Sequence, residues 1–65
     1  MNKEQIIEML KRRFEEEHRL FVMVREERHA TIDQQEIERL KKLEHFHFNR
    51  YHLLEELLQD IEDIE

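Results

Sequence analysis

The chain has 65 residues, of which 43% are charged and 38% hydrophobic, and its formal net charge at pH 7 is −6. A chain this short forms one domain at most, here residues 1–65, and a monomer of this size buries little core. The absence of Cys excludes disulfides and thiolate metal ligands. The negative charge disfavours a nucleic-acid backbone or an anionic membrane surface as the partner.

The first segment with helical periodicity runs from about residue 3 to residue 28. Its apolar side chains recur every three or four residues, which is the spacing of one face of an α-helix. They are Ile6, Ile7, Leu10, Phe14, Phe21 and Val24. We therefore expect a first helix over about 3–28.

A short turn is expected at about 29–32. Thr31 is followed three residues later by Gln34, and Asp33 by Glu36. Either pair matches the capping box that starts a helix, so the sequence indicates a restart here and leaves the capping residue open.

The second periodic segment runs from about residue 33 to residue 64. Its apolar positions are Ile37, Leu40, Leu43, Tyr51, Leu54, Leu57, Leu58, Ile61 and Ile64. The longest uninterrupted apolar run in the chain is Leu20 to Val24, far shorter than the ~20 residues of a membrane-spanning helix. We therefore expect no membrane partner, and a cytoplasmic location.

These elements predict an all-α fold, an antiparallel helical hairpin. A turn near Thr31 places residues opposite each other when their numbers add up to roughly 62. One hairpin cannot cover its own apolar stripe, so we expect a homodimer that forms a four-helix bundle, or a higher even oligomer. The broad apolar run Leu20–Val24 also suits a further protein partner.

Three polar residues interrupt the apolar stripes near the middle of the hairpin. Glu17 lies between Phe14 and Phe21 on the first helix, and Glu44 and His47 interrupt the second. The register brings all three to one level. Burying a carboxylate without a partner costs several kcal/mol, so this convergence requires an explanation.

A metal centre is one explanation. Glu44 and His47 are three residues apart on one helical face, and Glu17 faces them from the other helix. In a two-fold dimer the set doubles to four Glu and two His, which balances two divalent cations and suits iron or manganese. Glu-x-x-His also occurs at Glu15/His18 and at Glu26/His29, but only the Glu44/His47 pair lies on the stripe.

This arrangement resembles the site of ferritin-like di-iron carboxylate proteins, in which one helix supplies a Glu, the next supplies Glu-x-x-His, and the set occurs twice. The hairpin form resembles encapsulated ferritins and designed due-ferri hairpin dimers. The resemblance implies a di-iron site with Glu17 as the bridging carboxylate and Glu44 and His47 as terminal ligands. It also implies oxidation of Fe(II) by oxygen, whereas the spacing by itself indicates only a candidate site, with Mn or Zn as other metals.

Two alternatives stay open. Glu17 and Glu44 can instead form ion pairs with Arg13, Arg50 or a partner's Lys, which makes the chain a non-catalytic interaction or regulatory module without metal. His18 flanks the stripe beside Glu17, as a boundary residue or as a weaker, additional metal ligand.

Overall fold

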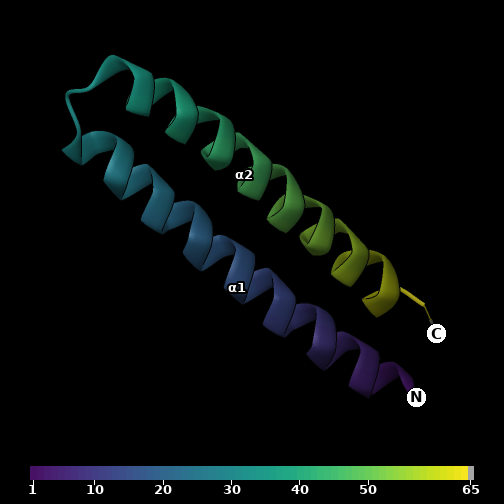
Figure 1. Ribbon diagram of the computed structural model, residues 1–65. Coiled ribbons are helices and arrows are strands. Elements are labelled where there is room, and N and C mark those ends of the chain that lie inside the picture. Colours follow the sequence, from purple (N-terminus) through teal and green to yellow (C-terminus); the bar gives the residue numbers. More distant parts are fainter. Residues whose placement is uncertain (65) are drawn as a thin grey trace.

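The computed structural model describes residues 1–64 and contains two α-helices, α1 over Lys3–Ala30 and α2 over Gln34–Glu62. The helices lie side by side in opposite directions, and both termini lie at the end away from the turn (Figure 1). The hairpin is 50 Å long and 14 Å across. The predicted all-α antiparallel hairpin is confirmed, whereas the four-helix bundle requires a second copy and stays a prediction.

Helix α1 begins with a capping box. The backbone N–H of Gln5 donates to the side chain of Asn2 at 2.8 Å, and the Asn2 N–H donates to Gln5 Oε1 at 3.1 Å. These two bonds satisfy backbone donors that the first helical turn otherwise leaves unpaired. The open end of the hairpin is closed further by Lys3, whose ammonium donates to the backbone carbonyl of Ile64.

The turn is settled by capping chemistry. Helix α1 continues to Ala30, two residues beyond the expected end, because Ala is the most favourable helix former. Thr31 is then extended, and Asp33 caps α2 by accepting from the N–H groups of Gln35 at 2.9 Å and Glu36 at 3.5 Å. Asp33 is therefore the N-cap of α2. Thr31 ends α1 instead, and its hydroxyl accepts from the Asp33 N–H at 3.2 Å.

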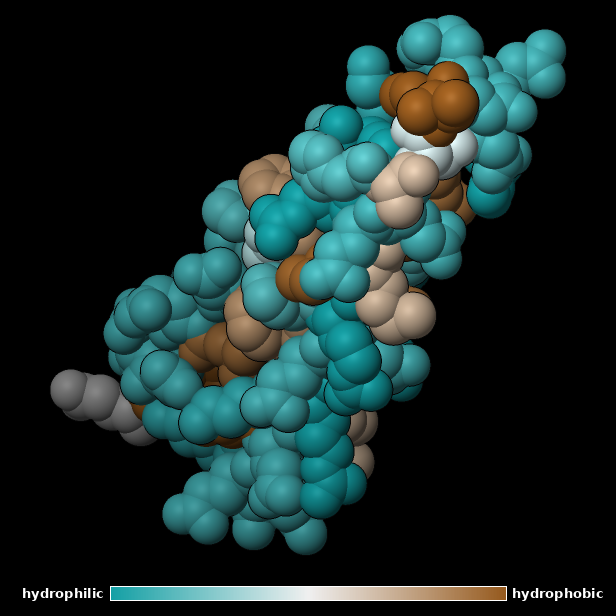
Figure 2. Space-filling view, turned by 90° about the vertical axis from the view of Figure 1, so that its left-hand side faces the viewer, coloured by the Kyte–Doolittle hydropathy of each residue, from teal (hydrophilic) through white to brown (hydrophobic). Residues whose placement is uncertain are grey.

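The core between the helices is thin. Among residues 1–64 only Leu40 is buried, with 3% of its surface exposed, and the other stripe residues are half-buried at best. Several large apolar side chains face solvent, and Figure 2 shows hydrophobic surface breaking through the hydrophilic face along the length of the hairpin. They include Met9, Met23, Phe46, Phe48, Leu53 and Leu57.

Among the residues that the structure describes, neither helix contains a stretch that is both long and apolar enough to cross a bilayer.

Candidate functional site at the middle of the hairpin

Glu17 and His47 meet across the hairpin at its middle. His47 Nδ1 and Glu17 Oε2 are 2.7 Å apart, and the two side chains are only 14% and 13% exposed. Because an ionised carboxylate can only accept a hydrogen bond, we assign the proton to His47 Nδ1, which donates it to Glu17. The register predicted from the turn therefore places these two residues together, as expected.

Arg50 completes the cluster around Glu17. Its Nε donates to Glu17 Oε1 at 2.9 Å, so each carboxylate oxygen has its own donor. Arg50 lies three residues after His47, which puts both side chains on the side of α2 that faces Glu17. The guanidinium carbon of Arg50 also lies over the Phe46 ring, 5.3 Å from the ring centre, which is a cation–π geometry.

The electrostatics keep Glu17 ionised at neutral pH. Burial by itself raises the pKa of this carboxyl group, but the hydrogen bonds from His47 and Arg50 and the positive charge of Arg50 outweigh it. The pKa of Glu17 is therefore lowered from its ordinary value of 4.5.

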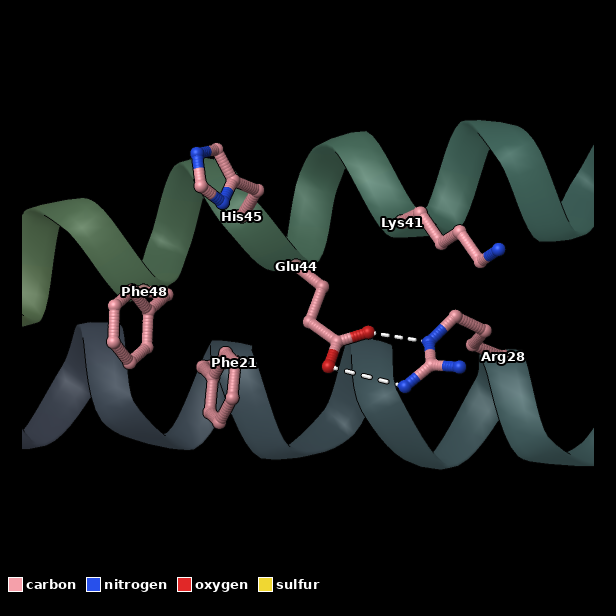
Figure 3. Close-up of a pocket in the computed structure, with 6 residues that line it drawn as sticks. All are labelled: Phe21, Arg28, Lys41, Glu44, His45 and Phe48. Carbon is pink, nitrogen blue, oxygen red and sulfur yellow. Dashed lines mark hydrogen bonds and ion pairs between the residues drawn. The ribbon is translucent and has the colours of Figure 1, made fainter.

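Glu44 has a different partner. Arg28, near the end of α1, donates from Nε to Glu44 Oε2 at 2.5 Å and from Nη2 to Oε1 at 3.3 Å. In Figure 3 the Glu44 side chain reaches from α2 toward α1 and both of its oxygens face the Arg28 fork. The Arg28 hydrogen bond lowers the pKa of Glu44 against the opposing effect of burial, so Glu44 is also ionised at neutral pH.

The two interruptions of the α2 stripe are thus separated. His47 belongs to the Glu17 cluster, whereas Glu44 lies one helical turn nearer to the hairpin turn and pairs with Arg28. No group of three or more His, Asp and Glu side chains within residues 1–64 is arranged to hold a metal ion. In the single hairpin Glu17 and His47 therefore lie together, and Glu44 lies apart from them.

Sequence reasoning missed Arg28. The signal was present, because the three- and four-residue count along the α1 stripe continues from Phe21 and Val24 to position 28. Of the two Arg partners considered for the carboxylates, Arg50 is confirmed at Glu17. Arg13 instead borders an open hollow beside this cluster.

His18 lies among aromatic rings. Its ring is 5.1 Å from that of Tyr51 and 6.1 Å from that of Phe14, centre to centre, and Phe21 lies at 6.4 Å. The residue is exposed on its outer side. Its contacts are those of a boundary residue packed against the aromatic side chains at the middle of the hairpin.

A scan against protein-family models found no match, and searches of curated proteins and of solved structures found none either.

Proposed function

We propose that the chain is a helical-hairpin interaction module that self-associates into a four-helix bundle. One observation carries the proposal: in a hairpin 50 Å long, Leu40 is the single buried residue among those described. A small helical domain needs more buried apolar surface than this to be stable, and a second copy supplies it.

Most of the exposed apolar side chains of the two helices lie on one side, whereas Phe48 lines a different hollow, beside Phe21. Glu16 is seven residues from both Met9 and Met23, so these three share one side of α1. Glu16 also borders the same open hollow as Leu53 of α2, which places the two helices' exposed rows on the same side of the hairpin. We call this side the apolar flank; on α2 it comprises Phe46, Leu53 and Leu57.

The size of this side fits a protein interface. Standard interfaces bury ~800 Å² per partner, and one long side of a hairpin that measures 50 by 14 Å is of this order. Charged side chains, here Arg13, Glu16 and Arg50, line the hollow between the two rows, so the surface combines apolar with polar contacts, as protein interfaces do.

Size-exclusion chromatography with light scattering tests the proposal over a range of micromolar concentrations. The wild type is expected to run as a dimer or a higher even oligomer. Leu53→Glu places a charge on the apolar flank and is expected to shift the population to monomer. Gln59→Glu adds the same charge at an exposed position seven residues after His52, on another side of α2, and should leave the dimer intact. A folded wild-type monomer, or equal effects of the two variants, would contradict the proposal.

A second candidate function is a metal centre, and a specific observation favours it. Glu17 and His47, which come from different helices, already meet at 2.7 Å at the predicted level. The described residues fit a metal only in part, since Glu44 is held by Arg28. In a dimer the two Glu17/His47 pairs, joined by Glu44 if it leaves Arg28, supply the mixed oxygen and nitrogen ligands that suit iron, with Mn or Zn as alternatives. With iron bound, oxidation of Fe(II) by oxygen is the activity to be expected by resemblance to ferritin-like proteins.

Anaerobic titration with Fe(II) or Co(II) tests this second candidate. About two ions per dimer are expected, by analogy with di-metal bundles. Binding should weaken on acidification, because His47 and the carboxylates ligate only when deprotonated. His47→Ala should abolish uptake, whereas the control His45→Ala, at an exposed position, should not. Absence of uptake, or equal uptake by both variants, would rule the metal centre out and leave the interaction module standing.

A further inference from the structure

The charges of α2 are distributed unevenly along its length. Its last part, residues 55–63, carries five acidic residues and no Lys or Arg. These residues are Glu55, Glu56, Asp60, Glu62 and Asp63. Near the turn, Arg39, Lys41 and Lys42 lie within four residues of each other. Glu36 and Glu38 largely offset them, so the turn end of α2 is close to neutral, whereas its open end is strongly anionic.

The apolar flank of α2 carries the same polarity. Arg39, Phe46, Leu53 and Asp60 are each seven residues apart, which is two helical turns, so they form one row along this side. In order, the row consists of a cation, two apolar residues and an anion. Its four positions are spaced symmetrically about the point between residues 49 and 50, with opposite charges at the two ends. Phe46 and Leu53, the two apolar members, are 51% and 56% exposed in the single hairpin.

We infer that the second copy binds the apolar flank with its turn at the opposite end, so that the two α2 helices run antiparallel to each other. The inference rests on the self-association proposed above. In this orientation the row is complementary to itself: Phe46 lies level with Leu53 of the partner subunit, and Arg39 lies level with Asp60 of the partner subunit. Each of these pairings occurs twice per dimer, as a two-fold interface requires.

The opposite orientation lacks this complementarity. A two-fold axis along the bundle puts both turns at one end and lays α2 against the partner's α1. The two acidic segments then lie at the same end, about 10–14 Å apart across the bundle, where screening by salt over ~8 Å only weakens their repulsion. With the turns at opposite ends, the segments are separated by nearly the full 50 Å of the hairpin.

Arg39 is free to exchange partners. In the single hairpin it pairs with Glu36, one turn away on the same helix, and both side chains are about half exposed. An exposed pair of this kind contributes little to stability, so Asp60 of the partner subunit can replace Glu36 or share the guanidinium with it.

A distance measurement distinguishes the two orientations. Ile32, at the tip of the turn, is 99% exposed, and the chain has no Cys, so Ile32→Cys gives one spin label per subunit without disturbing packing. Pulsed electron paramagnetic resonance should give a label separation above roughly 40 Å, set by the length of the helices. A separation below roughly 20 Å, about two helix diameters, would overturn the orientation.

Light scattering on the same labelled sample separates the two proposals. A dimer with a short label distance would overturn the orientation and leave self-association intact. A monomer would overturn the proposed function and the orientation with it.

Charge exchange provides an independent test. Arg39→Glu and Asp60→Arg should each raise the dimer dissociation constant about two- to thirty-fold, because each variant breaks two exposed ion pairs. The combination of both changes should return the dissociation constant to within about two-fold of wild type. Arg19→Glu, with the same charge change at an exposed position of α1, is the control and should have little effect. Additive losses in the combined variant would overturn the orientation, because Arg39 and Asp60 would then not face each other.

Discussion

Two half-buried carboxylates occupy equivalent places in the sequence pattern and different places in the structure. Glu17 and Glu44 each interrupt an apolar stripe. Glu17 accepts from His47 and Arg50, both on the facing helix, whereas Glu44 is held by the fork of Arg28 alone. One carboxylate thus has a partner that can lose its proton or bind a metal, and the other has a partner whose charge is permanent.

The different partners of Glu17 and Glu44 indicate which part of the hairpin can respond to protons or ligands. The Arg28–Glu44 pair lies in the turn half, and Glu44 is one helical turn from Leu40, the only buried residue of the described region. The Glu17 cluster lies at the middle and includes Arg50, which is 49% exposed against 24% for Arg28. We therefore expect the half of the hairpin near the turn to stabilise the fold, and the Glu17 cluster at the middle to respond to ligands.

The largest expected effect comes from Leu40. Leu40→Ala removes the only buried side chain among residues 1–64 and leaves a cavity between the helices, so the free energy of unfolding should fall by about 2–5 kcal/mol. Urea unfolding followed by circular dichroism, at matched protein concentration, measures this loss. Ile32→Ala, at the fully exposed turn position, should be near neutral. Equal losses in both variants would show that the turn half is not the packed half.

A smaller effect is expected at the carboxylates. Glu17→Leu leaves His47 and Arg50 without their acceptor and should lower the stability of the metal-free protein by about 1 kcal/mol. Glu44→Leu should lower it further, because the stranded Arg28 is less exposed than Arg50. Thermal melts with and without Co(II) measure both variants. A Glu17→Leu protein more stable than metal-free wild type, and no longer stabilised by Co(II), would instead support the metal centre.

The smallest effect is the dependence of stability on acid. The pKa values of Glu17 and Glu44 are both lowered by folding, so the stability they contribute is fully present above the unfolded value of about 4.5 and is lost as pH falls through the folded values. The unfolding free energy of the wild type should therefore decline as the pH is lowered from about 6 to about 3, the range in which carboxylates titrate. The Glu17→Gln, Glu44→Gln double variant should show a shallower decline, and an equal decline would contradict these pKa directions.

Local chemistry in the sequence determined the helices, their antiparallel arrangement and the meeting of Glu17 with His47. Apolar spacing of three and four residues specifies a helical stripe, and a short turn fixes which levels of the two stripes face each other. The same reasoning identified Arg50 as one possible partner of Glu17, because its position three residues after His47 keeps it at that level.

Only the tertiary structure decided the partner of Glu44 and the residue that caps α2. Glu44 and Arg28 have long side chains that reach about a helical turn beyond their own positions, so spacing along each helix does not select which carboxylate meets which cation. The choice between Thr31 and Asp33 likewise depends on the backbone path across the turn, in which Thr31 is extended and the Asp33 side chain accepts from the first N–H groups of α2. The sequence thus determines the features that follow from the spacing of apolar residues and from the register of the two helices. The packed structure decides which partners the long, flexible side chains contact.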